Sequence, residues 1–201
     1  MALLFAAPAQ ANLITNGSFE GGAHTNDFLT LAGGGTAISG WTATNGGVDW
    51  IHDNFWEASD GNFSLDLSAI SAGGMQAATD FASVIGQTDR ISFDLAGNTG
   101  GGNGIKNIRV GATSQDFSFD ISRHSRHSTQ SMGWESNSFI YTATSTTTSL
   151  GSLSLENSAF GPALDNVSVL AVQRNVPEPG PFALLALGLV LTGPGLQQRR
   201  G

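Results

Sequence analysis

The sequence predicts an all-β protein built as a two-sheet antiparallel sandwich, and three observations lead to that fold class. Several short segments alternate strictly between apolar and polar side chains, which is the period of a strand with one buried face. Joints rich in Gly and Asn, at residues 33–35, 45–47 and 97–104, separate these segments. Only 12% of the 201 residues are charged, and Lys, Glu and Leu are scarce in the middle of the chain, which argues against a helical bundle.

The individual strands follow from the alternation in chain order. The clearest alternation occurs at residues 64–68, 90–95, 116–122 and 166–169. Further candidate strands lie at residues 38–44, 48–51, 74–81, 105–113, 138–144 and 148–156. No intervening stretch has a helical period. About ten half-buried strands at this spacing predict a jelly roll, and the twelve Phe and four Trp residues can fill its core.

The two ends of the chain differ from the middle in composition. Residues 1–11 combine a short apolar run with Ala9-Gln10-Ala11, a small-x-small pattern that signal peptidase accepts, so we interpret them as the remnant of a signal peptide. The β-sandwich domain is expected at residues 12–172, a linker at 173–180, and a hydrophobic helix with a basic tail at 181–201.

The C-terminal segment has the pattern of a short membrane helix. Residues 182–196 would form a helix of about 22 Å, which is shorter than a hydrocarbon core of roughly 30 Å. Arg199 and Arg200 follow it and would supply a positive stop on the cytoplasmic side. Pro194 interrupts this helix.

This C-terminus resembles the PEP-CTERM sorting signal of Gram-negative bacteria. The motif residues are Val176, Pro177, Glu178 and Pro179, followed by the apolar stretch, Arg199 and Arg200. The resemblance implies that Pro177, Glu178 and Pro179 are recognised by a membrane protease of the exosortase type, and that the arginines retain the segment. It also implies an exported protein that is anchored in the membrane at least transiently, before it reaches the cell surface or the exopolysaccharide matrix.

The middle of the chain resembles the choice-of-anchor C family, whose domains are galactose-binding-like jelly rolls related to plant cell-wall proteins of unassigned function. The resemblance is carried by residues 12–20, Gly40-Trp41, 48–51, 60–67, 93–98, 132–134 and 161–169. It implies a fold and an exported location but no catalytic site. The histidine-rich turn at 123–128 is an individual elaboration.

The charge balance and the motifs restrict the possible chemistry. Acidic residues outnumber Lys and Arg by 16 to 8, so a nucleic-acid partner is not expected. The chain contains no cysteine and no G-x-S-x-G elbow, which removes a thiol nucleophile and a hydrolase of that type. His124 and His127 have the spacing of metal ligands, but Arg123 and Arg126 beside them would repel a dication, so an exposed hairpin tip is the favoured interpretation.

Trp50 and Trp56 are the candidate ligand-binding aromatic residues, because indole faces stack on sugar rings. Asp49 and Asp53 nearby could accept hydrogen bonds from sugar hydroxyls. The alternative, placement of both indoles in the core, is open at this point, and Trp41 and Trp134 are expected to be core residues. Asp49, Asp53 and Glu57 could also supply the paired carboxylates of a glycoside hydrolase, with solvated loop carboxylates as the alternative.

A structural calcium ion is expected between Glu20 and Asp165. Asp165 shares the parity of Val167 and Val169, which would place its carboxylate on the apolar face, where an isolated charge needs a cation or several donors. Galactose-binding-like modules often carry calcium at the corner where first and last strands meet, and Glu20 would be the second ligand. The alternative is that Asp165 accepts hydrogen bonds from backbone amides.

These observations predict an exported, surface-sorted and non-catalytic β-sandwich protein associated with the exopolysaccharide matrix or the cell envelope. The alternative function is a carbohydrate-binding module that recognises an extracellular polysaccharide. A third function, glycoside hydrolysis, depends on the carboxylates named above.

Overall fold

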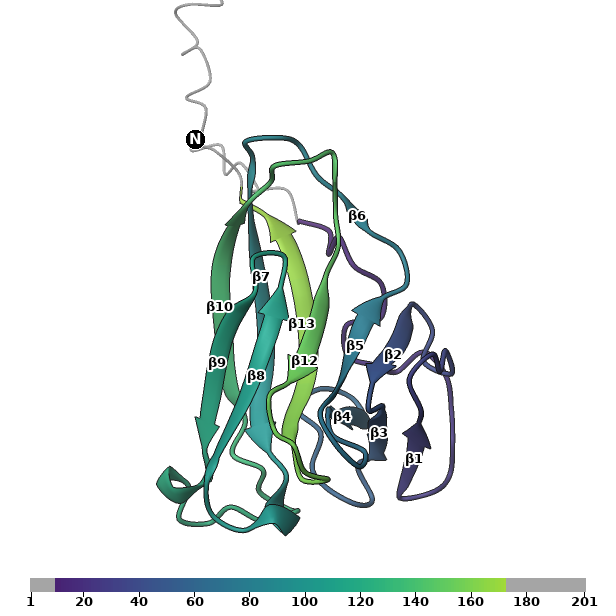
Figure 1. Cartoon of the computed structure of the whole chain (residues 1–201), viewed down its shortest axis with the longest axis vertical. Helices are drawn as coiled ribbons and strands as arrows, with labels where there is room; N and C mark the ends of the chain where they lie inside the picture. The colour runs from purple at the N-terminus through teal and green to yellow at the C-terminus, as the bar shows by residue number, and fades with distance from the viewer. Residues whose placement is uncertain (1–9, 173–201) are drawn as a thin grey trace, which may run out of the picture.

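The computed structural model describes residues 10–172, and these form a β-sandwich (Figure 1). The larger sheet has the order β1 (Phe28–Leu31), β3 (Val48–His52), β4 (Phe63–Asp66), β13 (Pro162–Ala171), β7 (Thr88–Gly97) and β10 (Glu135–Thr142). The smaller sheet has the order β2 (Trp41–Asn45), β5 (Gly73–Ala77), β12 (Gly151–Ser154), β8 (Ile105–Gly111) and β9 (Gln115–Asp120). Every pairing between strands is antiparallel. The predicted all-β, two-sheet antiparallel architecture is therefore confirmed.

The remaining elements are short. β6 (Phe81–Ala82) and β11 (Thr147–Thr148) pair with each other, and η1 (Thr99–Gly101) and η2 (Ile121–Arg123) are single 3₁₀ turns. Each of the ten candidate strands overlaps an observed strand. The predicted stretch 74–81 contains both β5 and β6, and β1 was not predicted.

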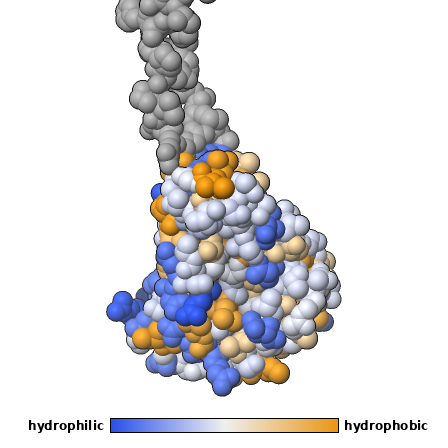
Figure 2. Space-filling view, turned by 45° about the horizontal axis from the view of Figure 1, so that its top comes forward, coloured by the Kyte–Doolittle hydropathy of each residue, from blue (hydrophilic) through white to orange (hydrophobic). Residues whose placement is uncertain are grey.

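The core lies between the two sheets, because alternate residues of each strand point inward. In β7, for example, Ile91, Phe93 and Leu95 are buried on this side. A second buried layer covers the outer face of the larger sheet, where the loop after β3 folds back over Ser64 of β4 through Trp56. The face drawn in Figure 2 is mostly of intermediate hydropathy, with small and separate hydrophobic areas.

Both described chain ends lie at one pole of the domain (Figure 1). The first residues run beside β13: the Leu13 amide donates to the Val169 carbonyl at 2.9 Å, and the Gln10 side chain donates to the Ala171 carbonyl. The 3₁₀ turns η1 and η2 lie at the opposite pole (Figure 1).

The predicted end segments lie almost wholly outside the described residues. These predictions are the signal-peptide remnant up to residue 9, the linker, the Pro177-Glu178-Pro179 motif, the hydrophobic helix, and Arg199 and Arg200. Within residues 10–172, no helix is long and apolar enough to span a membrane.

Candidate functional site

A groove of about 430 Å³ crosses the smaller sheet. It extends over β2, β5, β12 and β8, which are neighbours in the sheet, so its length is about 14 Å at about 4.8 Å per strand. Its lining comprises Thr44, Asn45, Met75, Gln76, Arg109, Gly111, Ala112, Ser114, Ser149, Gly151, Ser152 and Leu153. Small and polar side chains therefore predominate.

Two glycines open the floor of the groove. Gly111 of β8 and Gly151 of β12 are direct partners across the ladder, so two adjacent strands lack a side chain at the same level. A Cβ at Gly111 would meet only the Gly151 carbonyl oxygen, at 3.7 Å. Glycine inside a strand often marks a place where a ligand or another backbone approaches closely.

The polar side chains along the groove are held in place by neighbours. Gln76 Nε2 donates to Ser149 Oγ at 2.7 Å and to the Leu150 carbonyl at 2.8 Å. Arg109 Nε and Nη2 donate to the two carboxylate oxygens of Asp116 at 2.7 and 2.9 Å. The hydrogen bond from Arg109 lowers the pKa of Asp116, so this pair stays charged at neutral pH.

This lining can bind but offers little for acid–base chemistry. It contains hydroxyl, amide and guanidinium groups, and no carboxylate or imidazole lines it. The Ser152 hydroxyl is buried and has no hydrogen-bond partner among residues 10–172. The sequence shows Gly111 and Gly151 inside two expected strands, 105–113 and 148–156, but not that they lie side by side, so it did not reveal this site.

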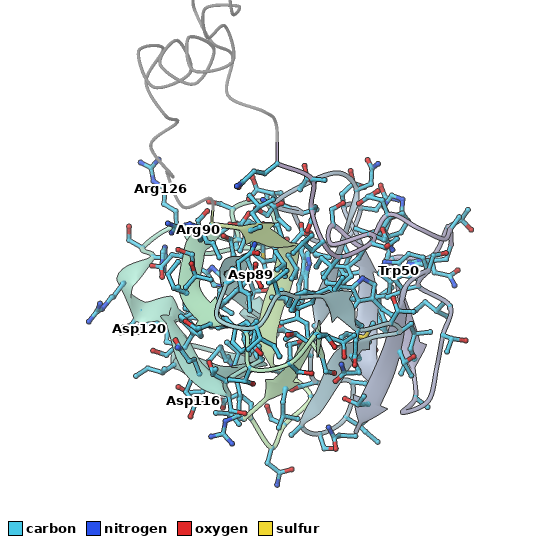
Figure 3. All side chains as sticks on the ribbon, turned by 90° about the horizontal axis from the view of Figure 1, so that it is seen from above. Trp50, Asp89, Arg90, Asp116, Asp120 and Arg126 are labelled. Carbon is cyan, nitrogen blue, oxygen red and sulfur yellow. The ribbon has the colours of Figure 1, made fainter. Side chains whose placement is uncertain are left out.

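The structure places Trp50 and Trp56 in the core, so their proposed role as sugar-stacking faces is wrong. Each side chain is only 1% exposed and offers no open face to a ligand. Trp50 packs against Phe63 with ring centroids 4.8 Å apart and lies inside the outline of the domain (Figure 3). Trp56 Nε1 donates to Ser64 Oγ at 2.7 Å. The alternative, core placement, is the one that the structure shows.

The other predicted tryptophans also take structural positions. Trp41 is 2% exposed, and its Nε1 donates to the Asn16 carbonyl at 2.8 Å. Trp134 is half-buried against the core and donates to the Glu57 carbonyl at 3.0 Å.

The carboxylates named for glycoside cleavage each have a separate partner. Asp49 Oδ1 accepts a hydrogen bond from Thr30 Oγ1 at 2.5 Å, and Asp53 lies 2.7 Å from His52 Nδ1. Glu57 Oε2 accepts the Met132 amide at 3.0 Å. Burial raises the pKa of Asp49, while the bond from Thr30 opposes that rise. None of the three lines the groove.

Asp165 does not share the face of Val167 and Val169, because a β-bulge at Asn166 breaks the alternation. The register of β13 against β7 shifts between Asp165 and Ser168, and Asn166 has a φ of 49°. Leu164 and Val167 both face the interior. Asp165 instead pairs with Asp94 on the outer face of the larger sheet, beneath the loop that contains Ser59.

Backbone amides satisfy both residues of the expected calcium pair. Asp165 Oδ2 accepts the amides of Ser59 and Asp60 at 2.8 and 2.9 Å, and its Oδ1 accepts that of Asn166 at 2.7 Å. Glu20 Oε1 accepts the amides of Asn62 and Phe63, both at 2.8 Å. Residues 10–172 contain no group of three or more His, Asp or Glu side chains arranged for a metal. This donor set fits the amide alternative and does not fit calcium.

A second, smaller pocket of about 220 Å³ lies at the histidine-rich turn. Its lining comprises Thr99, Gly102, Asn103, Ile121, Ser122, His124, Ser125 and His127. His124 stacks on Phe119 with ring centroids 4.4 Å apart and an angle of 12°, so this turn is packed onto the sheet and is not a free hairpin tip.

Both histidines have defined hydrogen bonds. His127 Nε2 lies 2.9 Å from the Gly97 carbonyl, which makes it the protonated nitrogen. His124 Nε2 lies 3.2 Å from Glu135 Oε1. Burial lowers the pKa of His127, while carbonyls of Gly97 and Met132 oppose that change, so His127 is neutral at pH 7.

Comparison with known proteins gives a family for nearly the whole domain. The sequence model described as "Protein of unknown function (DUF642)" matches residues 12–170. Halomucin of Haloquadratum walsbyi is 40% identical over 68 residues, which are 32% of this chain and 1% of that protein. The chain therefore spans a very small part of that curated relative.

Three solved structures of similar fold are named as carbohydrate-binding modules or as a xylan-binding domain. A CBM61 module in complex with β-1,4-galactotriose is 14% identical, with a TM-score of 0.48 over 81% of this chain and 99% of that one. A family 35 carbohydrate-binding module from Clostridium thermocellum is 10% identical, with a TM-score of 0.47 over 73% and 100%. A CBM22-1 xylan-binding domain from Paenibacillus barcinonensis is 17% identical, with a TM-score of 0.46 over 84% and 99%.

Proposed function

The chain belongs to the DUF642 family, to which no function is assigned, and we propose from its own geometry that it is a carbohydrate-binding module for an extracellular polysaccharide. The groove of about 430 Å³ across the smaller sheet is the observation that carries the proposal. It replaces the tryptophan site expected from the sequence.

The chemistry of the groove suits a chain of sugar rings. It is open and extends across four strands, so a polymer can lie along it without a chain end having to enter. Hydroxyl and amide groups of Thr44, Asn45 and Ser149 can exchange hydrogen bonds with sugar hydroxyls. Ala112 and Leu153 supply apolar contacts for the C–H faces of the rings.

The proposed module acts without catalysis and outside the cell. No carboxylate lines the groove, which supports binding over glycoside hydrolysis. The choice-of-anchor C resemblance of the domain and the PEP-CTERM resemblance of residues 176–200 support export, processing by an exosortase-type protease, and delivery to the surface or matrix.

A glycan array with the full chain in mild detergent tests the proposal, and a glycine pair supplies the matched variants. Gly111→Leu places a side chain in the open floor of the groove, where its Cβ has only the contact at 3.7 Å. Gly104→Leu adds the same side chain just before β8, where a Cβ meets nothing within 4 Å. Neither glycine has a positive φ, so neither leucine strains the backbone.

We expect the wild type and Gly104→Leu to retain the same neutral oligosaccharides, and Gly111→Leu to bind them at least tenfold more weakly. Matching melting temperatures for the two variants would show that the loss is local. If Gly111→Leu binds as the wild type does, the groove is not the site. If no glycan is retained by the wild type, the adhesive or matrix-associated function without a specific sugar ligand replaces this proposal.

A further inference from the structure

The turn at residues 121–128 concentrates positive charge in an acidic domain. Between residues 10 and 172 the Lys and Arg residues are Arg90, Lys106, Arg109, Arg123 and Arg126. Two of these five lie within four positions of one another, together with two of the four histidines of the chain. Such a concentration is a local exception in a chain with a formal net charge of −8.

The charged side chains of this turn differ in whether they have an ion-pair partner. Arg123 Nε lies 3.3 Å from Asp120 Oδ2, and His124 Nε2 faces Glu135. Lys106 is buried behind η1 and donates to the Phe160 carbonyl at 2.7 Å. Arg126 has no ion-pair partner among the described residues, and it points away from the ribbon (Figure 3).

The pocket beside these charges is polar and small. Its volume of about 220 Å³ is below the roughly 300–1,000 Å³ of sites for drug-sized ligands, so the pocket has room for about one sugar ring. The side chains of Thr99, Asn103 and Ser125 line it and can bond to hydroxyl groups, while Ile121 is a buried apolar wall.

We propose that this pocket is a second binding site, separate from the groove, that takes a carboxylated sugar residue of an acidic polysaccharide. Ring hydroxyls bond to the neutral polar side chains, and the carboxylate lies at the rim beside the lining residues His124, Ser125 and His127, where Arg126 follows Ser125 in the chain and can reach it. The pocket goes beyond the proposed function because it selects anionic saccharides at a different place in the fold.

A histidine that lines the pocket and the charges around it make the binding dependent on pH. Near pH 7 Arg123 is offset by Asp120, Glu135 faces His124, and His127 is neutral because burial lowers its pKa, so Arg126 is the main attraction for an anion. Protonation of His127 at lower pH adds a positive charge beside the pocket, while a uronate carboxylate stays ionised at pH 5. Affinity for an anionic sugar is therefore expected to rise as the pH falls.

A matched pair of oligosaccharides tests the inference. β-1,4-Trimannuronate and β-1,4-mannotriose differ only in carrying a carboxylate or a hydroxymethyl group at C6. Titration of the full chain is followed by NMR of the imidazole C–H resonances, because the chain has only four histidines and single substitutions can assign them. We expect trimannuronate to shift the His124 and His127 signals, leave those of His24 and His52 unchanged, and bind more tightly at pH 5 than at pH 7.5.

Two arginine variants separate a specific contact from general electrostatics. Arg126→Gln should weaken trimannuronate binding about tenfold at pH 5, whereas Arg123→Gln should change it less than threefold, because Arg123 is already paired with Asp120. Inorganic phosphate and sulfate, tested alone, should bind at least tenfold more weakly than trimannuronate.

Three outcomes would overturn the inference. Equal shifts from mannotriose would remove the role of the carboxylate, and phosphate or sulfate binding as tightly would indicate a general anion patch. The groove variant Gly111→Leu should bind trimannuronate as the wild type does. If that variant loses it, the acidic sugar lies in the groove and not in this pocket.

Discussion

Two buried aspartates predict that the free energy of unfolding falls as the pH rises from acid to neutral. Asp165 is fully buried, and its oxygens accept amides of Ser59, Asp60 and Asn166, with no Lys or Arg among these partners. Burial is the largest effect and raises the pKa of Asp165 from 3.8 to about 7, against the three amide hydrogen bonds. Burial likewise raises the pKa of Asp66 to about 7.

The sign follows from proton binding. Between pH 3.8 and 7 the folded state holds a proton on Asp165 that the unfolded state has released, so unfolding becomes easier as the pH rises. The stability that the protonated group contributes is fully present below about pH 3.8 and is lost as the pH rises through about 7. Between pH 4.5 and pH 7.5 the titration of one such group lowers the free energy of unfolding by roughly 3 kcal/mol, at about 1.36 kcal/mol per pKa unit.

The perturbation is Asp165→Asn, and the assay is urea unfolding followed by tryptophan fluorescence at four pH values from 4.5 to 7.5. Trp41, Trp50 and Trp56 are buried and report the loss of the core. The variant loses an acceptor for the Asn166 amide, so it should be less stable than the wild type at pH 4.5. Between pH 4.5 and pH 7.5 the wild type should lose roughly 3 kcal/mol of unfolding free energy that the variant keeps, so the variant gains that much relative to the wild type.

Asp116→Asn is the matched control, because Asp116 is exposed, is paired with Arg109 and has a lowered pKa. The contribution of Asp116 to the free energy of unfolding is constant above the pKa of Asp116 in the unfolded chain. The stability of Asp116→Asn should therefore depend on pH as that of the wild type does. Parallel profiles for Asp165→Asn and the wild type would refute the reasoning, as would a wild-type stability that rises with pH. Repeating the series with calcium and with EDTA also tests the expected ion, which would hold Asp165 ionised.

Two further predictions concern the core and the tail. Trp56→Ala should cost about 3–5 kcal/mol and lower the melting temperature by roughly 10 °C, whereas Phe55→Ala, at a side chain that is 38% exposed, should cost less than about 1 kcal/mol. Equal melting temperatures for the two variants in calorimetry would contradict the core placement of Trp56. Deleting residues 176–201 should convert a membrane-associated precursor into a freely secreted or periplasmic protein, and replacing Arg199 and Arg200 with Ala should weaken retention. Cell fractionation that finds the truncated protein still in membranes would exclude this role of the tail.

The alternation of side chains predicted the sandwich because each half-buried strand carries that signal within its own few residues. It could not predict the bulge at Asn166, since one extra residue reverses the faces and leaves the composition of the strand unchanged. The burial of Trp56 could not be predicted either. Its sequence is typical of a loop, and it is buried only because that loop folds back over β4. β1 is a four-residue edge strand, too short for a clear period.

The groove was beyond sequence reasoning for a different reason. Its lining comes from β2, β5, β12 and β8, whose order in the sheet differs from their order in the chain. Gly111 and Gly151 meet only through the register of β12 against β8, which nothing local specifies. The second pocket was partly visible, because the histidine-rich turn was recognised, but its contact with Gly97 depends on the tertiary fold.

Strand β7 connects the chain ends with the proposed sugar pocket and fixes the distance between them. At its start the Thr88 carbonyl accepts the Val172 amide, and at its end the Gly97 carbonyl bonds to His127. Ten residues in extended conformation span about 30 Å, so the pocket lies about that far from the pole where both chain ends emerge (Figure 1). If the tail holds the precursor at the membrane as proposed, that pole faces the lipid and the pocket faces outward. A module in this orientation can bind matrix polysaccharide while it is still anchored, and its affinity should not change when the tail is removed.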